Sequence, residues 1–84
     1  VRLDNTCSLF HGLPEKIEVA RYHSLIAVRQ NFPHDLITIG EDDAGEIMAV
    51  RHRHLKGVYG VQFHPESVMT PFGYVIMNNF LKEV

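Results

Sequence analysis

The fold is decided by one stretch, Gly60-Val61-Gln62-Phe63-His64-Pro65-Glu66-Ser67. Side chains alternate along an extended chain, so His64 and Glu66 share the face opposite Phe63 if this stretch is a strand. Pro65 fixes its own φ at about −65° and has no backbone N–H, so the strand must end here. The stretch therefore predicts an imidazole and a carboxylate together at the carboxyl end of a buried strand, where open α/β sheets bind their ligands.

An imidazole beside a carboxylate can serve as the base of a nucleophilic site. Glu66 would hold His64 in one tautomer and favour the imidazolium that forms when the ring takes a proton from a thiol or hydroxyl. Such a pair also needs a nucleophile, and acyl transfer needs an oxyanion hole. An isolated His-x-Glu is more often a plain turn that ends a strand, with its carboxylate in solvent. The pair alone leaves both interpretations open.

Further motifs lie on both sides of this stretch. Two blocks precede it, Arg21-Tyr22-His23-Ser24-Leu25 and Gly45-Glu46-Ile47-Met48-Ala49-Val50-Arg51-His52, and Thr70 and Gly73 follow it. In this order the motifs resemble the class I, or triad-type, glutamine amidotransferases. Within that family they are most similar to the amidotransferase subunits of anthranilate synthase (component II) and aminodeoxychorismate synthase. The resemblance extends along the whole chain, which would correspond to the second half of the family's domain.

The resemblance implies an α/β fold, the C-terminal part of a flavodoxin-like domain with several short strands in a mixed sheet and a C-terminal helix. His64 and Glu66 match the family's catalytic His and Glu. Ser24 and Leu25 match positions that bind the glutamine substrate, largely through backbone groups. No residue matches the family's nucleophile, a Cys in a Gly-x-Cys-x-Gly-His-Gln elbow, or its glycine-rich oxyanion segment. We therefore expect residues 1–84 to be a partial domain that is inactive without the missing N-terminal half.

The function implied by the resemblance is glutamine hydrolysis that supplies ammonia to a chorismate-using synthase. The partners would be L-glutamine, the synthase subunit (component I) and the missing half of the domain, and no cofactor is implied. The ending Thr70-x-x-Gly73, with residues 21–25, favours this branch over relatives that form carbamoyl phosphate or GMP. It does not separate the two chorismate branches. The alternative is a non-catalytic module that self-associates as a homo-oligomer, because half a sheet leaves an unpaired strand edge.

The composition is that of a small globular domain. The chain has 84 residues, of which 45% are hydrophobic and 21% charged, with a net charge of −2. This charge argues against a general nucleic-acid-binding protein. No apolar run approaches ~18 residues, so we expect no transmembrane helix and no membrane partner. A single cysteine excludes an internal disulfide framework and is compatible with the cytoplasm, the location that we expect.

Two other groups of residues could carry chemistry, and we expect neither to do so. Cys7 is not in a glycine-flanked strand-to-helix elbow, and an unpaired cysteine is most often a small buried hydrophobe. The basic cluster at residues 51–56, Arg-His-Arg-His-Leu-Lys, suits a solvated strand end better than a subunit contact or a nucleic-acid patch. His52 and His54 would share a face there, but no Cys-x-x-Cys or His-x-x-x-His spacing supports a metal site.

The remaining pattern predicts a succession of short strands. Residues 1–16 are expected to be irregular. Residues 17–20 alternate between apolar and charged side chains and residues 25–28 are continuously apolar, so each is expected to be a short strand. Residues 36–39 and 46–52 are expected to pair as a hairpin. The side chains expected to be buried under the first turn are Leu9, Phe10 and Leu13.

One helix is predicted after the central stretch. Thr70 suits the N-cap and Pro71 the first helical position. The residues that follow have the spacing of one apolar stripe, which would cover a face of the sheet and clamp the strand that carries His64. The stripe comprises Phe72, Val75, Ile76 and Phe80.

Overall fold

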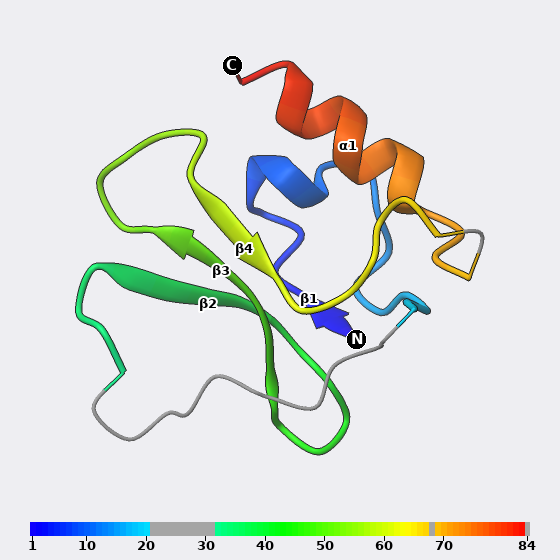
Figure 1. The fold of residues 1–84 in the computed structure, drawn as a ribbon, viewed down its shortest axis with the longest axis horizontal. Helices are drawn as coiled ribbons and strands as arrows, with labels where there is room; N and C mark the ends of the chain where they lie inside the picture. Colours follow the sequence, from blue (N-terminus) through cyan, green and yellow to red (C-terminus); the bar gives the residue numbers. More distant parts are fainter. Residues whose placement is uncertain (21–31, 68, 84) are drawn as a thin grey trace.

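The computed structural model describes residues 1–20, 32–67 and 69–83. In these ranges the chain forms a four-stranded sheet, a turn of 3₁₀ helix and a C-terminal α-helix (Figure 1). The elements are β1 (Arg2–Leu3), η1 (Ser8–Phe10), β2 (Leu36–Glu41), β3 (Ile47–His52), β4 (Tyr59–Val61) and α1 (Gly73–Leu81). This arrangement confirms the predicted α/β class. No helix in the described ranges has the length and apolar character needed to cross a membrane.

The four described strands pair antiparallel throughout, in the order β1-β2-β3-β4. β2 and β3 form the hairpin that the sequence predicts. The Asp42 carboxylate holds the turn by accepting hydrogen bonds from the amides of Ala44 (2.9 Å) and Glu46 (2.8 Å). Gly45 adopts φ of 80°, the left-handed region that glycine enters without a steric penalty. The hairpin is therefore specified by its own turn residues.

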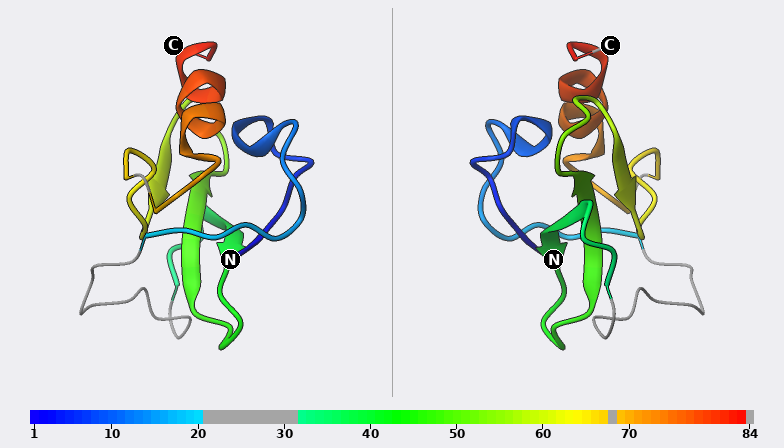
Figure 2. Two further views of the ribbon diagram at one scale, coloured as in Figure 1. Left: turned by 90° about the vertical axis from the view of Figure 1, so that its right-hand side faces the viewer. Right: turned by 90° about the vertical axis from the view of Figure 1, so that its left-hand side faces the viewer.

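The two helices α1 and η1 lie side by side, and the core lies between them and the sheet (Figures 1 and 2). The buried Asn79 on α1 joins them, because its amide donates hydrogen bonds to the carbonyls of Leu9 (2.9 Å) and His11 (3.0 Å). These carbonyls end η1 and would otherwise lack partners in the helix. The most deeply buried large side chains of the core are Phe10, Ile39 and Met48.

The N-terminal region is more regular than the sequence predicts. Residues 1–16 contain β1 and η1, and the expected burial of Leu9, Phe10 and Leu13 is confirmed. The strand predicted at residues 17–20 is wrong, because these residues form single backbone contacts and not a continuous ladder. Lys16 forms an isolated bridge with Arg2, Ile17 exchanges backbone hydrogen bonds with Val1, and Ala20 accepts one from His64. The strand predicted at residues 25–28 lies outside the described residues.

The α-helix starts later than predicted. Phe72 is its N-cap and makes no side-chain capping hydrogen bond, so Thr70 and Pro71 precede the helix. The predicted capping role of Thr70 is wrong because its hydroxyl bonds to other backbone groups. A local capping rule could not include those groups, which come from Ala20 and His64.

The apolar stripe of α1 is confirmed in its helical part. Ile76 is buried, while Val75 and Phe80 are partly buried against the core. Phe72 is 36% exposed, because it lies before the first turn of the helix. The ring of Phe80 meets that of Tyr59 edge to face at 6.2 Å, which ties α1 to β4.

Truncation of a core aromatic tests this packing. Phe10→Ala removes a fully buried ring and should lower the free energy of unfolding by about 3–5 kcal/mol. The matched control is Phe72→Ala, which removes a more exposed ring and should lower the free energy of unfolding by less than about 1.5 kcal/mol. Denaturant unfolding followed by circular dichroism measures both values. Equal losses in the two variants would contradict the assigned core.

Candidate active site

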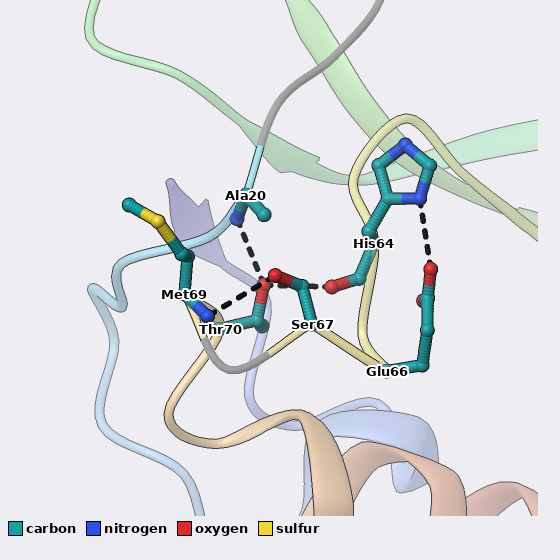
Figure 3. Close-up of polar contacts among 6 residues, drawn as sticks. All are labelled: Ala20, His64, Glu66, Ser67, Met69 and Thr70. Carbon is teal, nitrogen blue, oxygen red and sulfur yellow. Dashed lines mark hydrogen bonds and ion pairs between the residues drawn. The ribbon is translucent and has the colours of Figure 1, made fainter.

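The structure brings the side chains of His64 and Glu66 together. His64 Nδ1 lies 2.8 Å from Glu66 Oε1, and the ring points its Nε2 away from the carboxylate (Figure 3). Both residues follow β4, where the chain turns toward α1. The two side chains are 45% and 67% exposed, so the pair lies on the surface of the described chain. The predicted proximity of imidazole and carboxylate is therefore present in the structure.

The ionisation of Glu66 determines which atom donates this hydrogen bond. Its own backbone N–H, and secondly the His64 ring, hold the pKa of the Glu66 carboxyl below its ordinary value of 4.5. The group is therefore a carboxylate at neutral pH, and a carboxylate only accepts hydrogen bonds. His64 must then donate from Nδ1–H, which leaves the Nε2 lone pair as the basic site of the neutral ring.

Backbone turns hold the segment that carries this pair. The amide of Ser67 donates to the carbonyl of His64 (3.2 Å), that of Thr70 to Ser67 (3.0 Å), and that of Gly73 to Thr70 (2.9 Å). Each bond spans three residues, so three successive turns lead from His64 to Gly73, the first residue of α1. The Ser67 hydroxyl adds a contact by accepting from the Met69 amide at 3.1 Å (Figure 3).

The backbone of Ala20, which is distant in sequence, is hydrogen-bonded to the backbone of His64. The His64 amide donates to the carbonyl of Ala20 at 3.0 Å. The Thr70 hydroxyl accepts from the Ala20 amide (2.8 Å) and donates to the His64 carbonyl (2.7 Å), as Figure 3 shows. Thr70 is only 3% exposed. Sequence reasoning did not place Ala20 at the site and assigned Thr70 to the N-cap of the helix.

Gly73 allows α1 to approach the site closely. A Cβ placed on this residue would overlap the carbonyl group of Pro65, well inside the 3.0 Å that real Cβ contacts respect. The residue is buried, and its nearest neighbour is rigid backbone between His64 and Glu66. The spacing Thr70-x-x-Gly73 therefore has a physical meaning: one residue supplies a buried hydroxyl, and the other leaves room for a carbonyl.

The remaining predicted site residues, and the cysteine that was not expected to be catalytic, are placed as follows. Ser24 and Leu25, together with Arg21, Tyr22 and His23, lie outside the described residues. Cys7 is half-buried and is the N-cap residue of η1.

The basic cluster of residues 51–56 ends β3 and continues into an exposed loop, as predicted for a solvated strand end. His52 Nδ1 accepts from the amides of His54 (3.0 Å) and Leu55 (2.9 Å), so this ring caps a turn. No group of three possible metal ligands occurs in the ranges that the structure describes.

Comparison with known proteins identifies one family. A family model described as glutamine amidotransferase class-I matches residues 1–84. Anthranilate synthase beta subunit 2, chloroplastic, of Oryza sativa subsp. japonica is 49% identical over 82 residues, which are 96% of this chain and 29% of that protein. Anthranilate synthase component 2 of Porphyra purpurea is 48% identical over 73 residues, 87% of this chain and 39% of that protein.

A third relative combines two activities in its name. Aminodeoxychorismate/anthranilate synthase component 2 of Bacillus subtilis is 43% identical over 75 residues, which are 89% of this chain and 38% of that protein. The chain thus spans between 29% and 39% of the length of these three relatives. The predicted resemblance to component II proteins is confirmed.

A solved structure shares the fold. A protein from Thermoplasma acidophilum, assigned to GMP synthase as one of its subunits, superposes with a TM-score of 0.85 at 27% sequence identity. The match covers 96% of this chain and 39% of that chain. With the family match, this supports the predicted flavodoxin-like amidotransferase fold.

Substitution of Gly73 tests the close approach. Gly73→Ala should displace the Pro65 carbonyl or the start of α1 and lower the free energy of unfolding by about 1–3 kcal/mol. The matched control is Gly60→Ala, because a Cβ there meets only a side-chain methyl of Val50 at 3.3 Å. Gly73→Ala should also shift the amide resonances of His64 and Glu66, whereas Gly60→Ala should not. An unperturbed site in Gly73→Ala would contradict the assigned packing.

The depressed pKa of Glu66 predicts a pH dependence with a defined sign. The ionised carboxylate stabilises the folded chain fully above pH 4.5, its ordinary pKa. This stabilisation is lost as the pH falls through the lower pKa of the folded state. A carbon-detected NMR titration of the Glu66 carboxyl should therefore give a midpoint below 4.5. His64→Ala should raise this midpoint only partly, because the larger cause, the backbone N–H of Glu66, remains. A midpoint at or above the ordinary value in the parent chain would contradict the assigned contacts.

Proposed function

Because this chain belongs to the class I glutamine amidotransferase family, we propose that it supplies the His64–Glu66 part of a Cys-His-Glu site. The whole protein would be of the anthranilate synthase component II type, as are the relatives named above. The observation that supports this role most directly is the 2.8 Å contact of His64 Nδ1 with an ionised Glu66. That contact directs the basic Nε2 away from the carboxylate, which is the arrangement required of a general base.

The proposed reaction is hydrolysis of the glutamine side-chain amide. His64 Nε2 would take the proton of a cysteine thiol, and the thiolate would attack the amide carbon. The protonated ring would then give its proton to the leaving nitrogen, so that ammonia departs and a thioester remains. Water, activated by the same ring, would release glutamate and restore the thiol. Glu66 would stabilise the imidazolium present between the two proton transfers.

Other parts of the protein would complete this chemistry. No Gly-x-Cys-x-Gly-His-Gln elbow occurs in the 84 residues, so the nucleophile would come from another segment, and the chain alone would be inactive. Ser24 and Leu25 would bind the glutamine. The ammonia would pass to a chorismate-using synthase partner, forming anthranilate or aminodeoxychorismate. A cytoplasmic location stays a prediction, and the rice relative is named as chloroplastic.

Reconstitution tests this proposal. The purified chain is assayed for release of ammonia and glutamate from glutamine, alone and mixed with a segment that bears the cysteine elbow. We expect no turnover alone and measurable turnover in the mixture. His64→Ala should then lower kcat by about a hundredfold or more, since general base catalysis contributes about 10²–10⁴-fold. Glu66→Gln should lower it less, because the neutral amide can still accept from Nδ1–H.

The matched control is His11→Ala. His11 is exposed, and its carbonyl, not its ring, bonds to Asn79, so kcat should stay within about twofold of the parent value. Full turnover in the His64→Ala mixture would contradict the proposed base.

A second candidate function is a non-catalytic module that self-associates. Two features favour it. β4 is the edge strand of the described sheet, and Val58, just before it, and Val61, its last residue, are 45% and 37% exposed. Such an edge can pair with a strand of another copy. Stable oligomers in sedimentation, with no glutamine turnover alone or in the mixture, would favour this function over the first.

A further inference from the structure

Thr70 contributes a buried hydroxyl between two backbone segments. Its Oγ1 accepts a hydrogen bond from the Ala20 amide at 2.8 Å and donates one to the His64 carbonyl at 2.7 Å (Figure 3). The residue is 3% exposed, so water does not compete for these bonds. Both bonds reach backbone groups, and Ala20 lies 50 residues earlier in the chain.

The geometry resembles an antiparallel strand pair with a hydroxyl inserted on one side. In a closely spaced antiparallel pair, two opposed residues exchange both N–H···O bonds. Here His64 donates directly to the Ala20 carbonyl at 3.0 Å. The return bond, from the Ala20 amide to the His64 carbonyl, is replaced by two bonds through Thr70 Oγ1. The hydroxyl therefore sets how far apart these two segments lie.

These two segments would carry different parts of the proposed reaction. The chain runs from Ala20 directly into residues 21–25, which contain the predicted glutamine-binding residues Ser24 and Leu25. The other segment carries the imidazole of His64. We propose that Thr70 is a positioning residue that fixes the spacing between the backbone of Ala20 and the backbone of the proposed base, His64. This inference rests on the proposed function for its catalytic meaning, while the hydroxyl bridge itself can be tested without turnover.

Loss of the Thr70 hydroxyl would affect its two hydrogen-bond partners, the His64 carbonyl and the Ala20 amide, to different extents. The His64 carbonyl also accepts from the Ser67 amide at 3.2 Å and so keeps a partner without the hydroxyl. The Ala20 amide has Thr70 Oγ1 as its acceptor, and a buried donor left without a partner is costly. Removal of the hydroxyl should therefore displace the Ala20 side more than the His64 side. The expected kinetic signature is a change in KM for glutamine larger than the change in kcat.

Three variants separate positioning from simple stability. Thr70→Val keeps the shape of the side chain and removes the hydroxyl, whereas Thr70→Ser keeps the hydroxyl and removes a methyl group. Ile39→Val is the stability control, because Ile39 is 1% exposed in the core and takes no part in the hydrogen bonds that join Ala20, Thr70 and His64.

The first measurement is made on the 84-residue chain without substrate. Amide hydrogen exchange at Ala20 should speed up by about tenfold or more in Thr70→Val, and by less than threefold in Thr70→Ser. Ile39→Val should raise exchange across the core without a specific effect at Ala20. Equal exchange at Ala20 in the Val and Ser variants would overturn the proposal.

The second measurement uses the mixture with the cysteine-bearing segment. Thr70→Val should raise KM for glutamine about tenfold and change kcat by less than threefold, and Thr70→Ser should restore KM. If the parent mixture turns over glutamine and the Thr70→Val mixture has the same KM, the positioning role is overturned. If the parent mixture shows no turnover, the proposed function fails, and the exchange at Ala20 still decides whether the hydroxyl sets the spacing.

Discussion

The contact between the Pro65 carbonyl and the bare Cα of Gly73 is the constraint on which this site depends. It brings the first residue of α1 against the turn between His64 and Glu66, and it exists because residue 73 has no Cβ. Three successive backbone turns lead from His64 to that contact. This contact therefore fixes three features at once: the direction of the chain after β4, the start of α1 and the position of the Glu66 backbone. A larger residue at 73 would alter all three, although it lies seven residues from Glu66.

The hydrogen bond between His64 and Glu66 cannot by itself hold the site together. Both side chains are about half exposed or more, and exposed charged contacts contribute little to stability because solvent screens them. The geometry must therefore come from the backbone, which is fixed by buried groups, the Thr70 hydroxyl and Gly73. The molecule thus separates two duties. Buried residues set positions, and the solvent-accessible pair carries the proposed chemistry.

The sequence predicts the local parts of this structure and fails where the partners are distant. The hairpin of β2 and β3 was predictable because the alternation of its strands and the glycine of its turn act within a few residues. The meeting of His64 and Glu66 was predictable for the same reason, since only Pro65 lies between them. Thr70 was misassigned as a helix cap because Ala20, its amide partner, lies 50 residues away and no local rule includes it. The strand expected at residues 17–20 failed similarly, because core packing alone can produce alternating burial.

The local origin of the pair has a consequence for how a complete site would form. Among the described residues, most of the contacts that orient the His64 backbone come from residues 60–73, and a distant contribution enters through the backbone of Ala20. The depressed pKa of Glu66 keeps its charge in place at neutral pH, so the tautomer of the ring is chosen before any thiol arrives. A nucleophile from another segment would then meet a proton acceptor that is already oriented, and binding need not reorganise it. What the rest of the protein would have to supply is the sulfur, the oxyanion donors and cover from solvent for a pair that is exposed here.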